Sequence, residues 1–206
     1  MTDLHDELNA FDSAAHWADE LVGAIPDSAW GGPGLGDWDL RALVGHTSRA
    51  LLTVEQYLAM PAEAEDADSA EAYYERAARL PSADPGAVLQ RGIDAGAALG
   101  EHPAAGFHEI VGRVSALLAD ERDQIVATIV GGIRLSSYLP TRTFELVVHG
   151  LDIAHAAGLP ASPPAVALRR ALELATSLAL RSGEGPRLLM AVTGRGGLSR
   201  GFSVLN

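Results

Sequence analysis

The chain has 206 residues, of which 48% are hydrophobic and 20% charged, and this composition favours one packed globular domain over a disordered chain. It has no cysteine, which excludes structural disulfides, cysteine-based zinc sites and a thiol nucleophile supplied by the protein itself. Its 15 basic residues are all arginine, so lysine Schiff-base chemistry is excluded, and the 27 acidic residues bring the net charge to −12. Such a charge repels phosphate backbones, so we expect no nucleic-acid partner.

Nothing in the sequence predicts a membrane-bound or secreted protein. No run of about 18 uninterrupted apolar residues is present, so no transmembrane helix is expected. The first residues, MTDLHDELNAFD, are acidic and lack the basic and apolar regions of a secretory signal. We therefore expect a cytoplasmic protein, with a homodimer as the default oligomeric state.

In chain order, apolar side chains with a helical period predict a first helix over 2–24, which Pro26 ends. A glycine-rich loop, GGPGLGDW, follows without the lysine of a phosphate-binding loop. A second helix with a core-facing apolar stripe begins near Asp39 and stops before Pro61. The acidic segment after it is expected on the surface, with a short helix around AYYERAARL.

The second half of the chain is also predicted to be mainly helical. An alanine-rich helical pattern runs from Pro85 to about residue 119, broken or kinked near Pro103. Two β-branched runs around Gly131-Gly132 predict a short β-hairpin. Helices over about 136–157 and 164–182 follow, and the tail resembles two short strands joined by a glycine-rich turn. These elements predict a helical bundle over 1–183, with a β tail at 184–206 packed on it.

The helix over 136–157 carries the residues of greatest chemical interest. It is apolar around most of its circumference, which is typical of a buried helix, and its one polar stripe contains Arg142, Glu145, His149 and Asp152. Buried carboxylates and imidazoles need a partner or a metal ion, and the i, i+4 spacing lets Glu145 and His149 coordinate the same ion. Asp152 can orient an imidazole or face a ligand. The alternative is a solvated face carrying ordinary ion pairs.

A third ligand is expected from another helix, and His46 is the candidate. It lies at the flank of the apolar stripe of the second helix, at the edge of the bundle interior. A lone histidine there is more often a structural residue with its hydrogen bonds satisfied. The remaining five histidines have weaker claims because of their positions in the pattern: His5, His16, His102, His108 and His155.

Two segments carry a resemblance to a known family. DWDLRALVGHTSRALLTVEQYL around His46 and TRTFELVVHGLDIAHAAGLP around Glu145 and His149 resemble the mycothiol-dependent maleylpyruvate isomerase family, within the DinB-like superfamily of metal-binding four-helix bundles. The terminal LLMAVTGR…GFSVLN is similar to the end of short actinobacterial members. The resemblance implies a mainly α fold and a metal triad of His46, Glu145 and His149. The isomerases that name the family carry a longer C-terminal domain, which puts the isomerase reaction itself in question.

Two histidines and one carboxylate suit Zn²⁺ with an open fourth position, although Fe²⁺ or Ni²⁺ fits the same ligands. The resemblance implies that a small thiol, mycothiol, binds there and attacks an electrophilic substrate, as in an isomerase or an S-transferase. Arg142 could bind a carboxylate of the substrate or thiol, or pair with Glu145 or Asp152. The alternatives are a metal-dependent hydrolase on the same scaffold and a metal-binding protein without turnover.

Overall fold

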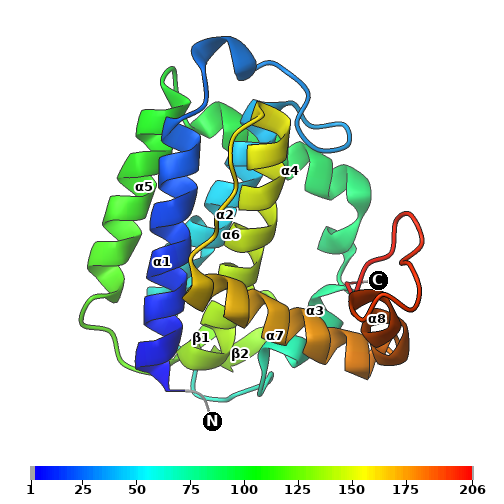
Figure 1. Cartoon of the computed structure of the whole chain (residues 1–206). Coiled ribbons are helices and arrows are strands. Elements are labelled where there is room, and N and C mark those ends of the chain that lie inside the picture. Colours follow the sequence, from blue (N-terminus) through cyan, green and yellow to red (C-terminus); the bar gives the residue numbers. More distant parts are fainter. Residues whose placement is uncertain (1–2, 206) are drawn as a thin grey trace.

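The structure is a computed structural model that describes residues 3–205. Figure 1 shows a mainly helical molecule with one small β-hairpin at its lower end. Two short 3₁₀ turns lie in the loops, at Asp27–Ala29 and Pro81–Ala83. The helices of the described chain are α1 (Leu4–Gly23), α2 (Leu40–Leu58), α3 (Ala70–Ala77), α4 (Pro85–Ala98), α5 (Pro103–Leu118), α6 (Leu135–Ala157), α7 (Ala165–Arg181) and α8 (Gly185–Val192).

Four helices form the bundle. Helix α1 packs against α5 and α6, and α2 packs against the same two, so the four close a ring around one core. Its largest fully buried side chains include Phe11, Leu43, Phe107 and Leu146, one from each helix. Each of the four helices therefore buries an apolar face, as the periodicity predicts. The predicted helical bundle is confirmed.

Local sequence signals set the ends of the helices that carry the candidate site. The side chain of Asp39 accepts a hydrogen bond from the amide of Ala42 at 2.7 Å and caps α2. Helix α6 ends at Gly158, which has a φ of 66° and so adopts the left-handed conformation that glycine favours. Pro103 is the first residue of α5, so the predicted break between the helices α4 and α5 is confirmed.

Helix α4 lies outside the ring and packs closely on α2 through glycine. A Cβ atom on Gly45 would overlap the backbone of Gly96, and one on Gly92 would overlap the indole of Trp38. Because these positions lack side chains, α4 can approach α2 and hold Trp38 between the two helices. The Nε1 group of this indole donates to the carbonyl of Leu89 at 2.9 Å.

The hairpin forms where it was predicted, but its turn is different. Strands β1 (Ile125–Thr128) and β2 (Gly131–Arg134) pair antiparallel, so Ile129 and Val130 make the turn and the two glycines begin β2. Gly132 donates its amide to the Asp66 carboxylate at 2.7 Å and accepts from the amide of Ala67. The glycines thus let the acidic segment after α2 lie against the strand.

In its described residues, the C-terminal tail does not form the β-strands that the sequence predicted. The predicted pair of short strands is absent from residues 184–205, and Gly185–Val192 forms the helix α8, which packs on α7. The apolar run LLMAV looks like a strand, but Pro186 in the first turn favours a helix start. The domain division at residue 183 stays a prediction. Within residues 3–205, no helix is long and apolar enough to cross a membrane.

Candidate metal centre

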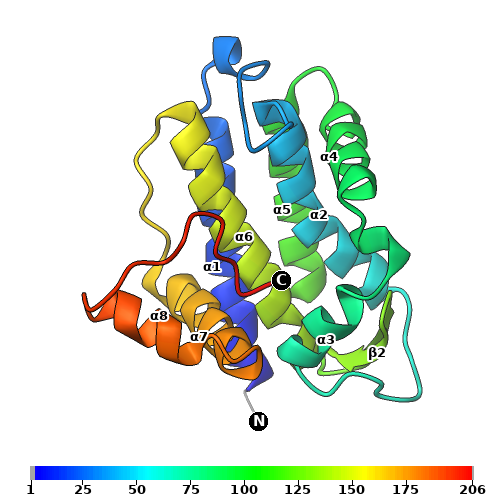
Figure 2. The ribbon, with the colours of Figure 1, turned by 90° about the vertical axis from the view of Figure 1, so that its right-hand side faces the viewer.

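The three expected ligands come together between α2 and α6. One ligating atom from each of His46, Glu145 and His149 lies within 4.8 Å of the other two. Glu145 and His149 are one turn apart on α6, and His46 faces them from α2. The imidazole rings of the two histidines meet edge to face, with centroids 4.9 Å apart. Figure 2 shows α2 and α6 side by side, with the C-terminal segment passing in front of α6.

His149 is held from both sides by carboxylates. Its Nε2 lies 3.2 Å from Oε2 of Glu145, and its Nδ1 lies 3.1 Å from Oδ2 of Asp152. The side chain of His149 is 14% exposed and that of Asp152 31% exposed. Asp152 therefore fixes the ring and leaves Nε2 directed at the other two candidate ligands.

The electrostatics of this pair come from opposing effects. Burial alone would raise the pKa of Glu145, but the hydrogen bond with His149 and the charge of Arg142 outweigh it and lower the pKa to about 2. Burial alone would lower the pKa of His149, but its hydrogen bonds to Asp152 and Glu145 raise it to about 9. With these pKa values, the two side chains form a half-buried ion pair.

His46 is different, because it has no carboxylate partner of its own. Burial, helped by the nearby charge of His149, lowers the pKa of His46 to about 4, so its imidazole is neutral. Its Nδ1 is buried and has no hydrogen-bond partner among the described residues. The ring packs on Trp38 with centroids 4.5 Å apart. A neutral, unpartnered imidazole beside an ionised carboxylate is a donor set that fits a divalent cation.

Arg142 lies about one turn before Glu145 on α6 and is buried. The residue is 9% exposed, and its guanidinium lies 5.1 Å from the ring centroid of Tyr138 and 5.5 Å from that of Tyr73. Its Nε donates to Oγ1 of Thr141 at 2.9 Å. Burial would lower the pKa of Arg142, but the surrounding tyrosines and Glu145 raise it, so its charge persists. In this position Arg142 supports the ionised form of Glu145.

Tyr74, on α3, contacts the candidate site and was not identified from the sequence. Its hydroxyl donates to Oε1 of Glu145 at 2.6 Å. Burial and the adjacent Glu145 carboxylate raise the pKa of Tyr74 well above its ordinary value, so the hydroxyl keeps its proton. A tyrosine in a short surface helix carries no spacing signal, and only the tertiary fold shows its partner.

Two of the histidines with weaker claims pair with aspartates at the surface. Nε2 of His16 lies 3.5 Å from Asp12, and its side chain is 57% exposed. Nδ1 of His108 lies 2.7 Å from Asp19. Neither belongs to the cluster around Glu145.

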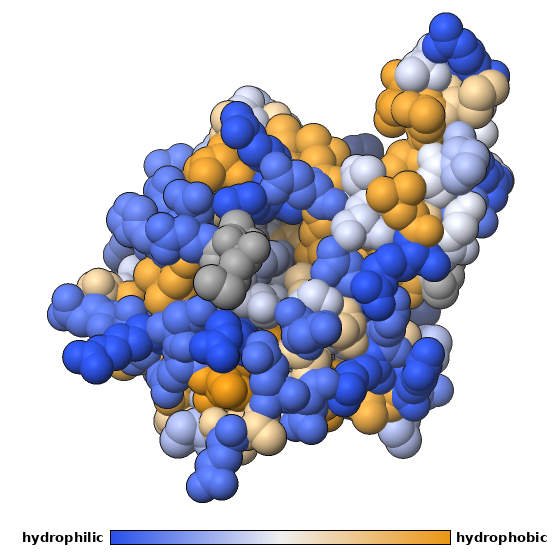
Figure 3. Space-filling view, turned by 90° about the horizontal axis from the view of Figure 1, so that it is seen from below, coloured by the Kyte–Doolittle hydropathy of each residue, from blue (hydrophilic) through white to orange (hydrophobic). Residues whose placement is uncertain are grey.

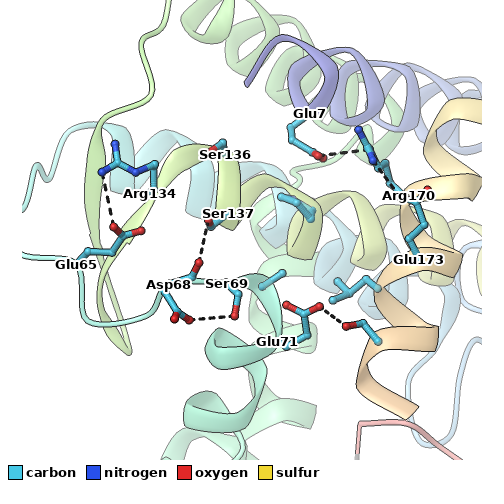
Figure 4. A pocket seen from close by; sticks show the side chains of 14 residues that line it. Glu7, Glu65, Asp68, Ser69, Glu71, Arg134, Ser136, Ser137, Arg170 and Glu173 are labelled. Carbon is cyan, nitrogen blue, oxygen red and sulfur yellow. Dashed lines mark hydrogen bonds and ion pairs between the residues drawn. The ribbon is translucent and has the colours of Figure 1, made fainter. Parts of the chain in front are cut away.

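A separate polar cavity of about 550 Å³ lies near the N-terminal ends of α1, α3 and α6 and along α7. Figure 4 shows Glu7 and Arg170 paired with each other on one side of it, and Arg134 paired with Glu65 on the opposite side. Glu7 is 1% exposed, its Oε1 lies 3.4 Å from Nε of Arg170, and its Oε2 has no hydrogen-bond partner among the described residues. Seen from below, the surface of this end of the molecule is mostly hydrophilic, with scattered hydrophobic patches (Figure 3).

The fold and these contacts define a helical-bundle protein with a candidate two-histidine, one-carboxylate metal centre. The family model of the mycothiol maleylpyruvate isomerase N-terminal domain matches residues 11–154, and the chain belongs to this family. The resemblance inferred from the sequence is thereby confirmed, and the family is named for an enzyme.

A solved structure supports the fold. The crystal structure of the mycothiol-dependent maleylpyruvate isomerase matches with a TM-score of 0.53 and 18% sequence identity, over 87% of this chain and 72% of that one. At this identity the match shows a shared fold. No curated protein sequence matches the chain.

Proposed function

We propose that this protein is a metal- and thiol-dependent enzyme, an isomerase or S-transferase, with its active site at His46, Glu145 and His149. The observation that carries the proposal is the convergence of these side chains, from two helices, within 4.8 Å. Membership of a family named for a mycothiol-dependent isomerase supports the thiol. The chain has no cysteine, so any thiol must come from another molecule.

The donor set suits Zn²⁺ and leaves a position for a further ligand, while Fe²⁺ and Ni²⁺ remain compatible with it. When bound, such a cation favours the thiolate over the thiol of a ligand sulfur. The protein contributes a neutral His46, a Glu145 carboxylate that stays ionised, and a His149 ring held by Asp152. Arg142 contributes a buried positive charge next to Glu145, and we propose no direct contact between Arg142 and substrate.

The substrate proposed is an electrophile with a conjugated double bond or a leaving group. Addition of the thiolate to a conjugated double bond breaks the π bond and allows rotation, and expulsion of the thiolate then restores the double bond in the other geometry. Displacement of a leaving group would instead make the thioether the product. A cytoplasmic location and a homodimer stay predictions.

Thermal unfolding of the zinc-loaded protein, with and without mycothiol, tests this proposal. A ligand that binds only the folded state raises the free energy of unfolding by about 2.7 kcal/mol when its concentration is a hundred times the dissociation constant. The melting temperature rises accordingly. We expect this shift with the loaded protein and a much smaller one after chelation of the metal.

The control is the His149→Ala variant, which should bind neither metal nor thiol. No shift of the loaded wild-type protein at saturating mycothiol would contradict thiol dependence. Metal-dependent cleavage of generic esters or amides without thiol would instead identify a hydrolase.

A further inference from the structure

The hydroxyl of Tyr74 reaches the candidate metal centre from outside the four-helix ring. It donates to Oε1 of Glu145 at 2.6 Å, while Oε2 of the same carboxylate faces His149 at 3.2 Å. We propose that Tyr74 is a positioning residue that fixes the Glu145 carboxylate for metal binding, with Oε2 as the oxygen directed at the ion. This inference rests on the metal centre proposed above and adds a determinant of its affinity.

The physical reason lies in the freedom of a glutamate side chain. The terminal torsion of glutamate is broad, so a free carboxylate samples many orientations and loses that freedom when it binds an ion. A short O–H···O⁻ hydrogen bond is charge-assisted and about twice as strong as a neutral one. By occupying Oε1, the Tyr74 hydroxyl restricts the carboxylate before the metal arrives and so lowers the entropic cost of binding.

The ring of Tyr74 is itself held in place. It meets the ring of Phe144 on α6 edge to face, with centroids 5.9 Å apart, and that of Tyr73 at the same separation. The hydroxyl also lies 3.3 Å from the carbonyl oxygen of Thr141, one turn before Glu145. A tyrosine packed on two sides presents its hydroxyl at a fixed point.

Helix α3 also contacts α7 through polar side chains. Nε of Arg181 lies 2.5 Å from Oε1 of Glu75, the residue after Tyr74, and Ser177 hydrogen-bonds to Glu71. Ser69 caps the first turn by accepting from the amide of Ala72. Helix α3 therefore contacts both α6 and α7, which also pack on each other.

The two candidate ligands on α6 are thus oriented in different ways. Asp152 orients His149 from the same helix, three residues away. Tyr74 orients Glu145 from a segment 71 residues distant in sequence. The geometry of the carboxylate consequently depends on how α3 docks.

The test compares Tyr74→Phe with Tyr73→Phe in the full chain. Each variant removes one hydroxyl from the same helix, but only the hydroxyl of Tyr74 contacts Glu145. The affinity for Co²⁺ is measured by competition with a chromophoric chelator, together with the visible spectrum of the cobalt-loaded protein. We expect Tyr74→Phe to weaken affinity about 10- to 100-fold and to alter the spectrum, and Tyr73→Phe to stay within about twofold of wild type.

A second comparison separates positioning from general loosening of the fold. In a Glu145→Ala background, Tyr74→Phe should cause no further loss of cobalt affinity, because its effect passes through the Glu145 side chain. Equal affinities and spectra of Tyr74→Phe and wild type, or fully additive losses in the double variant, would overturn the positioning role alone. A wild-type protein that binds no cobalt would overturn the metal centre and this inference together.

Discussion

Glu145 and Glu7 are both carboxylates withdrawn from solvent, with side chains 20% and 1% exposed, yet their pKa values move in opposite directions. The pKa of Glu145 falls to about 2, whereas burial, only partly offset by Arg170, raises that of Glu7 to about 7. Both oxygens of Glu145 have polar partners, Tyr74 and His149, while Oε2 of Glu7 has none. Burial raises the pKa of both carboxylates, and the number and charge of the partners decide whether this effect is outweighed.

The difference also separates the candidate metal centre from the polar cavity by what each can bind. A carboxylate that remains ionised beside a neutral imidazole is ready to accept a cation. One that takes up a proton near neutral pH makes its surroundings sensitive to pH instead. Substitution of the same residue type at both places should therefore give different results.

The largest expected effect is on metal binding. Glu145→Gln replaces a charged candidate ligand with a neutral amide, and we expect zinc affinity to fall by more than about 100-fold. This loss exceeds the one typical for a residue that only hydrogen-bonds to a ligand. Elemental analysis and chelator competition measure it. Glu7→Gln is the matched control and should keep the wild-type stoichiometry and affinity. Equal metal content in both variants would remove Glu145 from the metal centre.

A second effect concerns stability as a function of pH. Because the folded-state pKa of Glu7 is raised from 4.5 to about 7, its contribution to stability is fully present below pH 4.5 and is lost as the pH rises through 7. We therefore measure the free energy of unfolding of wild type and of Glu7→Gln with urea. The value for wild type minus that for the variant should fall by roughly 2–3 kcal/mol between pH 5 and pH 8. A constant difference across this range would contradict the assignment.

The smallest expected effect concerns the orientation of His149. Asp152→Asn keeps the shape of the side chain but removes the charge next to Nδ1, and we expect about tenfold weaker zinc binding. The control is Asp12→Asn, which alters the exposed Asp12–His16 pair and should leave zinc affinity unchanged. A loss of the same size in both variants would indicate a general electrostatic effect.

Much of the fold follows from periodicity in the sequence. The apolar stripe of α2 and the nearly all-round apolar character of α6 predict buried helices, and both are in the bundle. Tyr138 lies one turn before Arg142 on the same face of α6, and the Arg142 guanidinium lies over its ring. Helical spacing is a local property, so it can be deduced without the tertiary structure.

What could not be predicted depends on contacts between distant segments. The sequence gives no sign that Tyr74 meets Glu145, because α3 is short and its docking depends on α6 and α7 together. The polar stripe of α6 likewise does not predict that Arg142 packs on the ring of Tyr73, another residue of α3. The tail was assigned to strands because a five-residue apolar run fits a strand and a helix equally.

The contact of α3 with both α6 and α7 also bears on where the functional unit ends. The family match stops at residue 154, which leaves all three candidate ligands inside it and the whole of α7 outside it. A fragment cut at that boundary would retain every atom of the triad but lose Arg181 and Ser177, which contact α3 from α7. A transplanted centre that includes α7 would therefore keep the contacts that help to position α3.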